Sequence, residues 1–123
     1  MSIHFEKHTT YPDLILIKKF CGEVNVDTII DSWIDMINQN LIMKTHKGVI
    51  NDLVNCKLIM NHPGFEKLIA FLKSQKLLRS LKLAVICDSP DKIVYPMLGE
   101  SVEKELKIKP FTTIDAAINW IIN

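Results

Sequence analysis

At 123 residues the chain has the length of one domain, 1–123, and can bury a core without disulfides or metals. Its formal net charge of +1 excludes a global positive field for nucleic acid or an anionic membrane. The cysteines Cys21, Cys56 and Cys87 form no Cys-x-x-Cys pair, which favours buried thiols in a reducing cytosol. Because no signal peptide and no stretch of ~20 apolar residues is present, we expect a cytoplasmic protein without a membrane span.

The first elements form a predicted hairpin. Residues 3–8 alternate weakly between apolar and polar, and residues 14–20 (LILIKKF) are apolar enough for a second strand. The turn signal at residues 11–13 makes the two strands antiparallel neighbours at a sheet edge. We expect Cys21-Gly22-Glu23 to end the second strand.

A helix, a strand and a second helix are expected next. Apolar residues from Val26 to Leu41 recur every three or four positions, and Asn25 or Asp27 can cap this helix. Residues 48–53 (GVINDL) predict a short buried strand, whereas residues 54–61 are less regular. The second helix starts with Asn61 as a cap and Pro63 in its first turn, and its apolar face extends to Leu77.

The stretch Leu83–Cys87 contains five apolar residues without a break, which predicts a parallel strand buried on both faces. Ser89 is a candidate helix cap. Because Pro96 disfavours helix at the preceding residue, we expect a turn over residues 90–95 and a helix from 96 to 105. Residues 108–111 predict a short edge strand, and Thr112 with Asp115 matches a capping box for the last helix.

The predicted order of elements is β-β-α-β-α-β-α-β-α. Strands that alternate with helices predict an α/β fold with right-handed parallel crossovers, here a mixed, mostly parallel sheet with an antiparallel hairpin at its N-terminal edge.

The chain resembles the STAS domains of anti-sigma-factor antagonists, and more closely the SpoIIAA-like proteins of unassigned role in bacteria. Three stretches carry the resemblance: residues 49–53 (VINDL), residues 83–88 (LAVICD) and the ending 111–121 (FTTIDAAINWI). The resemblance implies a SpoIIAA-like sheet in largely sequential strand order, with helices around it. It covers nearly the whole chain by element order and about thirty residues by pattern.

One departure from the family concerns its phosphorylation site. In phosphorylated members a Ser or Thr stands at the start of the helix after the third strand, in an Asp-Ser-Ser-Gly type of sequence. The matching stretch here is Asn61-His62-Pro63-Gly64, and Ser and Thr are absent from residues 53–73. The resemblance therefore implies the fold without this phosphorylation switch.

A binding site is expected beyond the carboxyl ends of the parallel strands, where helix N-termini also begin. The polar side chains expected there are Asn51, Asp52, Asn61, His62, Asp88 and Ser89, with Thr112. The structural alternative is that Asn61, Ser89 and Thr112 are helix caps and that Asp88 accepts from backbone donors in its turn.

We predict no catalytic residue, metal or cofactor. His62 beside Asp52 or Asp88 would suit a general base, but no activated nucleophile can be named next to it. His4 and His8 share one face of a strand and could join His46 at a metal, although no Cys or carboxylate spacing supports such a site.

The primary functional hypothesis is a non-enzymatic cytoplasmic interaction or regulatory module that binds a protein partner or itself, without nucleic acid. Tyr95, Pro96, Met97 and Leu98 would form a dimer or partner patch if exposed, and otherwise belong to the core. The first alternative is a small-molecule or lipid-like ligand in a pocket between sheet and helices. The second alternative is an enzyme at the Asp52/His62/Asp88 edge.

Overall fold

The computed structural model describes residues 2–102 and 104–123, with the side chains of all of these except 101 and 102. The strands within these ranges are β1 (Ser2–Lys7), β2 (Ile15–Asn25), β3 (Gly48–Asp52), β4 (Cys56–Ile59), β5 (Lys82–Ile86) and β6 (Lys107–Phe111). The helices are α1 (Val26–Asn38), α2 (His62–Ser74), α3 (Lys76–Arg79), α4 (Pro90–Val102) and α5 (Ile114–Ile122).

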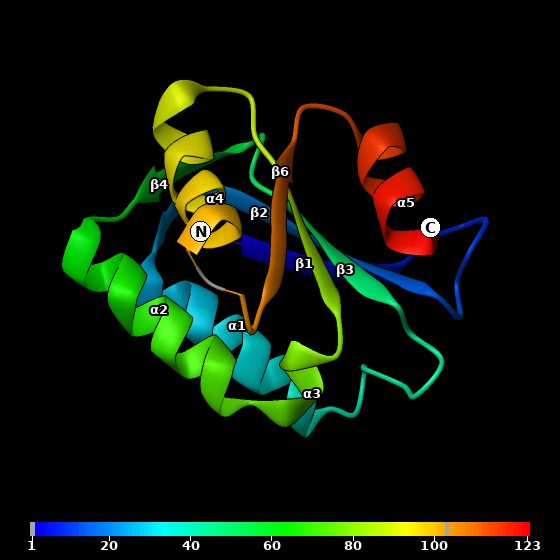
Figure 1. The fold of residues 1–123 in the computed structure, drawn as a ribbon. Helices are drawn as coiled ribbons and strands as arrows, with labels where there is room; N and C mark the ends of the chain where they lie inside the picture. The colour runs from blue at the N-terminus through cyan, green and yellow to red at the C-terminus, as the bar shows by residue number, and fades with distance from the viewer. Residues whose placement is uncertain (1, 103) are drawn as a thin grey trace.

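The strands form one mixed sheet in the order β1-β2-β3-β5-β6, with β4 paired to the second half of β2 (Figure 1). The β1–β2 pair is antiparallel, whereas β2–β3, β3–β5 and β5–β6 are parallel. The predicted fold class and its N-terminal edge hairpin are confirmed. The apolar run at residues 83–87 supplies β5, which lies between β3 and β6 as a buried strand should.

Helices cover both faces of the sheet (Figure 1). Because side chains alternate along a strand, Leu16 and Phe20 of β2 point to one face and Ile15 and Ile17 to the other. The first face packs against α1, α2 and α4, and the second face packs against α5. No helix in the described part of the chain is long and apolar enough to cross a bilayer.

Strand β2 is longer than predicted. Cys21-Gly22-Glu23 does not end the strand, which continues to Asn25. Gly22 has a φ of 83°, a left-handed conformation that glycine adopts without steric cost. From Gly22 onward β2 pairs with Cys56–Ile59, so the stretch predicted as irregular contains β4. The sequence signal was weak because Val24 is the one buried residue among positions 21–25.

The second predicted helix is divided. Helix α2 ends at Ser74, the extended residue Gln75 follows, and α3 begins at Lys76. The Ser74 hydroxyl donates to the Phe71 carbonyl at 2.6 Å, a local bond that competes with helix continuation. Leu77, which we predicted on the apolar face, is 39% exposed, and Leu78 is buried in its place.

Helix α4 contradicts the predicted turn over residues 90–95, because it runs unbroken from Pro90 to Val102 with Pro96 inside. An interior proline leaves the carbonyl four residues earlier, here that of Lys92, without its helical donor. The Cys87 thiol donates to the Lys92 carbonyl with an Sγ–O distance of 3.6 Å. Pro96 is itself buried, so its packing offsets part of the lost backbone bond.

The predicted caps Asn25 and Asn61 are confirmed. The Asn25 Oδ1 accepts from the Thr28 N–H at 2.9 Å, and the Asn61 Oδ1 accepts from the Gly64 N–H at 2.8 Å. The prediction of Thr112 as the cap of the last helix is wrong by one position. Thr113 is the cap of α5, because its Oγ1 accepts from the Ala116 N–H at 3.2 Å.

Replacing the cap Asn61 with alanine is expected to destabilise the fold by about 1 kcal/mol, because α2 loses the acceptor for one free backbone N–H. Asn61→Asp keeps an acceptor at the same place and is the matched control. Urea unfolding of both variants measures the difference. Equal losses of stability in the two variants would contradict the capping role.

Candidate functional site

The carboxyl ends of β3 and β5 bring three of the predicted site residues to one edge of the sheet. Asp52 lies opposite Ile86 in the parallel register, and Asp88 and Ser89 follow directly on the way into α4. The Asp52 Oδ1 accepts from the Val54 N–H at 3.0 Å, which fixes the turn after β3. Ser89 contributes its backbone carbonyl, which accepts from two N–H groups in the first turn of α4.

Lys92 is the organising side chain of this edge, and sequence reasoning missed it. Its side chain is 9% exposed, and its Nζ donates to the Asp88 Oδ1 at 2.8 Å and to the Val54 carbonyl at 3.3 Å. Burial opposes the charge of Lys92, but the bond to Asp88 leaves the lysine pKa raised. The same hydrogen bond lowers the pKa of Asp88. The pair therefore stays ionised at neutral pH and ties α4 to the turn after β3.

Two buried thiols lie close to this ion pair. Burial raises the pKa of Cys56, and burial raises that of Cys87 to about 11, although Lys92 acts in the opposite direction on both. The Cys56 thiol donates to the Leu53 carbonyl at 3.3 Å. Since the thiolate is the reactive form of cysteine, these two side chains are packing groups at neutral pH rather than nucleophiles.

Asn61 and His62 lie apart from that edge. Ile59, just before them, pairs with Asn25 of β2, whereas Asp52 pairs with Lys19. The six residue steps from Lys19 to Asn25 span about 20 Å of extended chain. The His62 Nε2 is 2.9 Å from the Glu66 Oε1, and both side chains are largely exposed. The structure therefore does not assemble Asp52, His62 and Asp88 into one acid–base group.

His8 and His46 stabilise turns, whereas the His4 Nε2 lies 3.5 Å from the Glu6 Oε2 on β1. The His8 Nδ1 accepts from the N–H groups of Thr10 and Tyr11, inside the β1–β2 turn. The buried His46 accepts from the Met43 N–H at 2.8 Å through its Nδ1. No group of three or more His, Cys, Asp or Glu side chains suited to a metal ion occurs in the described part of the chain.

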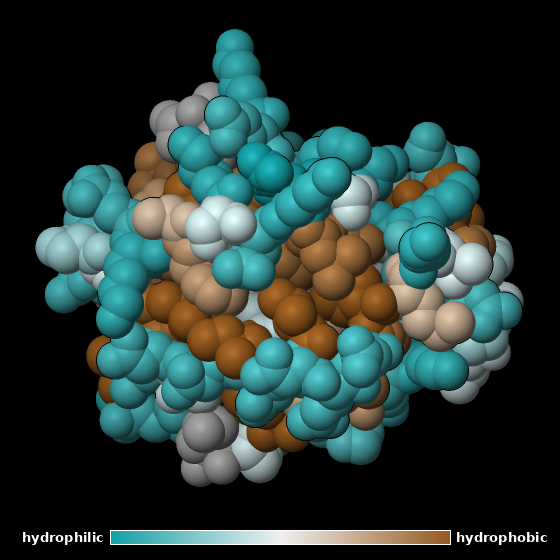
Figure 2. Space-filling view, turned by 90° about the horizontal axis from the view of Figure 1, so that it is seen from below, coloured by the Kyte–Doolittle hydropathy of each residue, from teal (hydrophilic) through white to brown (hydrophobic). Residues whose placement is uncertain are grey.

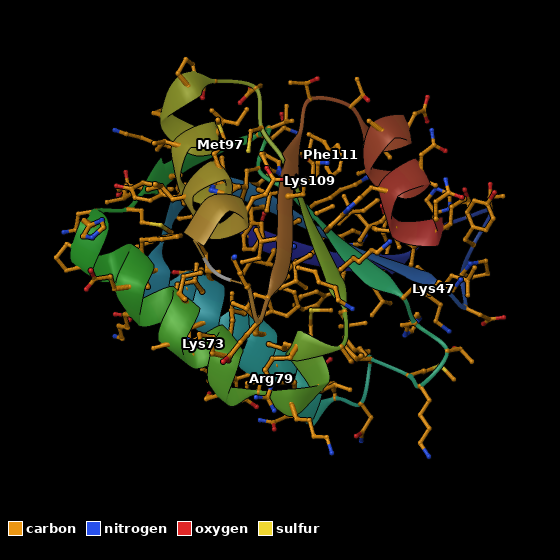
Figure 3. All side chains as sticks on the ribbon, viewed as in Figure 1. Lys47, Lys73, Arg79, Met97, Lys109 and Phe111 are labelled. Atoms are coloured by element: carbon orange, nitrogen blue, oxygen red, sulfur yellow. The ribbon has the colours of Figure 1, made fainter. Side chains whose placement is uncertain are left out.

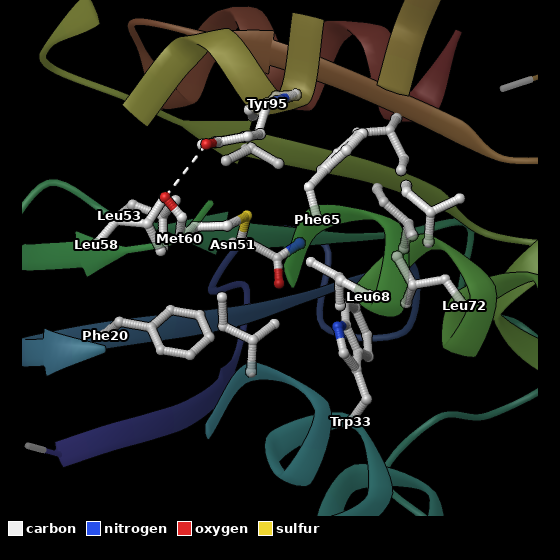
Figure 4. A pocket seen from close by; sticks show the side chains of 16 residues that line it. Phe20, Trp33, Asn51, Leu53, Leu58, Met60, Phe65, Leu68, Leu72 and Tyr95 are labelled. Atoms are coloured by element: carbon white, nitrogen blue, oxygen red, sulfur yellow. Dashed lines mark hydrogen bonds between the residues drawn. The ribbon is translucent and has the colours of Figure 1, made fainter. Parts of the chain in front are cut away.

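A cavity of about 80 Å³ lies between the sheet and the helices α1, α2 and α4 (Figure 4). Sixteen residues line it, among them Phe20, Trp33, Met60, Phe65, Leu72 and Val85. Phe65 and Tyr95 close part of its wall, with ring centroids 5.3 Å apart. A volume of this size admits several water molecules or a small organic ring, and its walls favour the apolar occupant.

Two polar side chains reach the cavity. Asn51, predicted at the strand-end edge, points into the cavity instead, and its Nδ2 donates to the Ala84 carbonyl at 3.1 Å (Figure 4). The Tyr95 hydroxyl donates to the Met60 carbonyl at 3.2 Å, which joins α4 to the turn before α2. Neither side chain carries a charge, so the cavity suits a neutral ligand.

Lys18 lies behind the cavity wall and is fully buried. Its Nζ is 3.2 Å from the centroid of the Trp33 ring and donates to the Ser32 Oγ at 3.0 Å. Burial holds the pKa of Lys18 well below its usual range. A signal was present in the sequence: two adjacent lysines in a strand point to opposite faces, so one of them enters the core wherever a helix covers one face of the strand.

Two solved structures share this arrangement. One is an uncharacterised protein of the DUF3478 family with a SpoIIAA-like fold from Shewanella loihica PV-4, with a TM-score of 0.62 and 16% sequence identity over 98% of this chain and 92% of that chain. The chain has a SpoIIAA-like fold. The anti-sigma factor antagonist SpoIIAA in its unphosphorylated form is also similar, with a TM-score of 0.56 and 13% identity over 99% of each chain. No family model matches the sequence, and no curated protein matches it.

Proposed function

We propose that this chain is a non-enzymatic interaction or regulatory module of the cytoplasm, that residues 1–123 act as a single domain, and that it binds a protein partner or itself. The observation that carries the proposal is that the strand-end side chains make structural hydrogen bonds. Asp52, Asn61 and Asp88 each make a bond that holds the fold. An acid–base catalyst needs such groups within hydrogen-bond reach of each other and of a substrate.

The SpoIIAA-like fold supports the regulatory part of the proposal, since one of the two similar structures is an anti-sigma factor antagonist. We propose that the module works without the phosphorylation switch of that family. The start of α2 reads Asn61-His62-Pro63-Gly64, and residues 53–73 contain no Ser or Thr. The side chain that accepts from the third N–H of this helix is an amide, which a kinase does not phosphorylate.

A pull-down from host lysate with the full chain as bait, combined with light scattering of the pure protein, tests the proposal. The expected result is a specific partner or a defined oligomer, unchanged by ATP and by phosphatase treatment. A pure monomer that captures no protein would contradict it.

A second candidate function is the binding of a small neutral, apolar molecule, and the cavity is the observation that favours it. Its lining is almost entirely hydrocarbon, and Asn51 is the polar side chain turned into its centre (Figure 4). Ligand pockets of proteins are commonly apolar with a few placed polar groups. Benzene is the suitable probe, because it is a small apolar ring of the kind that apolar protein cavities bind.

Replacing the lining residue Val85 with phenylalanine is expected to fill the cavity and abolish probe binding. In the unmodified chain, a probe at about 100 times its dissociation constant should raise the free energy of unfolding by about 2.7 kcal/mol. Val94→Phe introduces the same ring on the exposed side of α4 and should leave the probe effect intact. Thermal unfolding with and without probe measures both, and an equal probe effect in Val85→Phe would exclude the cavity as the binding site.

A further inference from the structure

One end of the molecule is basic. The parallel strands begin there, with Gly48, Lys82 and Lys107 side by side in register. Six exposed cations gather at this end: Lys44, Lys47, Lys76, Arg79, Lys104 and Lys107. Among the residues whose side chains the structure describes, three exposed side-chain carboxylates, those of Asp13, Asp35 and Glu105, share the end, so the described cations outnumber them two to one. In Figure 3, Arg79 lies at the lower part of the molecule and Lys47 at its right-hand side.

The basic end also exposes apolar side chains. Met43 is 48% exposed and Leu77 is 39% exposed. Seen from below, apolar side chains form a band that polar side chains frame (Figure 2). An apolar centre with a charged rim is the usual composition of a surface that binds another protein.

The opposite end is acidic. Asp52 and Asp88 follow β3 and β5, and Asp91 and Asp115 stand in the first turns of α4 and α5, which begin at the upper side in Figure 1. Asp88, Asp91 and Asp115 are exposed. The cation Lys92 is buried and already bonded to Asp88. Val54 and Ile114, each 37% exposed, supply apolar surface among these carboxylates.

We propose that the basic end of one chain binds the acidic end of a second copy, so that the protein associates head to tail. This inference rests on the self-association in the proposed function and specifies its surfaces. Each end carries the charge and the apolar side chains that the other end needs, although the net charge of the chain is only +1. Opposite charges across an interface speed encounter and fix its orientation.

A second copy fits better than a nucleic acid or a membrane as the occupant of the basic end. Base stacking needs exposed aromatic rings, whereas the exposed apolar side chains here are Met43 and Leu77. An anionic membrane would use the basic end and leave the acidic end, with its own exposed Val54 and Ile114, unexplained. Because the two contact surfaces are different, the association gives either a closed ring of several copies or an open chain of increasing length.

The test uses the full chain and two variants that each neutralise one end. Lys76→Gln with Arg79→Gln weakens the basic end, and Asp91→Asn with Asp115→Asn weakens the acidic end. Asp27→Asn with Lys67→Gln removes one charge of each sign, from the exposed ion pair between α1 and α2, and is the control. Sedimentation velocity over a concentration series measures association at about 0.01 M and about 1 M salt, where the screening lengths are about 30 Å and 3 Å.

At low salt the unmodified chain and the control should form assemblies larger than a pair, and high salt should dissociate them. Each end variant alone should associate at least about tenfold more weakly. An equimolar mixture of the two end variants should form one-to-one pairs and nothing longer, because each keeps one intact end.

Unchanged association in either end variant, or a mixture that does not pair, would overturn the head-to-tail geometry while leaving self-association in place. A chain that is monomeric at every salt concentration would overturn the inference. The lysate pull-down would then decide whether the chain binds a different protein, as the proposed function also allows.

Discussion

Replacing Lys18 with methionine is expected to stabilise the protein at neutral pH by about 1–3 kcal/mol, the usual cost of burying a polar group whose hydrogen bonds are only partly made. Lys18 is fully buried, and its described contacts are the Trp33 ring and the Ser32 hydroxyl, not a carboxylate. The Ser32 hydroxyl keeps its own acceptor in the variant, because it donates to the Ile29 carbonyl at 2.6 Å. The substitution therefore leaves no new unsatisfied polar group.

The stabilisation should depend on pH in a defined direction. Burial lowers the pKa of Lys18 in the folded state, while the unfolded chain has the ordinary value of about 10.4. Between these two pKa values the unfolded chain holds a proton that the folded chain lacks. The free energy of unfolding should thus rise with pH in this window, by up to about 1.4 kcal/mol per pH unit, and Lys18→Met should remove that rise.

Urea unfolding from about pH 6.5 to pH 9.5 measures the effect, in a window chosen below the ordinary lysine pKa. Lys19→Met is the matched control, because Lys19 is exposed and its hydrogen bond with Glu6 raises its pKa instead. Destabilisation by Lys18→Met would contradict the expected gain in stability, and the same pH slope in Lys18→Met and the unmodified chain would show that burial does not lower the pKa of Lys18.

Replacing Gly48 with alanine is expected to destabilise the fold by about 1–3 kcal/mol, the usual cost of overpacking. A Cβ atom at this position would lie 2.7 Å from the Lys82 carbonyl oxygen and 2.8 Å from two carbons of Ile121. The carbonyl belongs to the neighbouring strand β5 and cannot turn away as a flexible side chain does. Gly48 therefore allows α5 to lie directly on the start of β3.

The same substitution at Gly99 should not lower the free energy of unfolding. Gly99 lies inside α4, and a Cβ there would be 3.4 Å from the Ile108 Cδ1, which is an ordinary contact. Alanine has the higher helix propensity by about 0.5–1 kcal/mol, so Gly99→Ala should be neutral or stabilising. Denaturant midpoints of the two variants give the comparison, and a harmless Gly48→Ala would contradict the packing of α5 on the sheet.

The sheet could be predicted because its strands have simple patterns. Residues 83–87 are uninterruptedly apolar, which identified β5 as a strand covered on both faces, and the hairpin turn at residues 11–13 fixed the antiparallel edge. The extension of β2 past Cys21 and the pairing of β4 were missed. These segments owe their structure to each other and to the conformation of Gly22 rather than to their own composition.

Helix boundaries were less predictable for the same reason. Pro96 argued for a break, but its burial and the thiol of Cys87, supplied from β5, compensate the backbone of α4. The sequence of residues 90–105 alone gives no indication that the Cys87 thiol donates to this helix. Thr112 and Thr113 are adjacent hydroxyl residues, so the choice between them as the cap depended on backbone geometry.

The candidate site was predicted in part. Asp52, Asp88 and Ser89 do meet at one edge, because the carboxyl ends of parallel strands coincide. His62 was misplaced because β4 carries the chain away from that edge before α2 begins. The cavity and the burial of Lys92 depend on how helices that are distant in the sequence pack together, and a local sequence pattern does not predict such packing.

Native mass spectrometry of the purified chain tests the central claim most directly, because it reports assembly and retained ligand in one spectrum. A module that binds itself should appear as multiples of the 14.1 kDa chain mass, with the larger species lost in either end variant. A chain that remains at 14.1 kDa at every concentration and carries a retained small molecule would contradict this account and favour the cavity as the functional site.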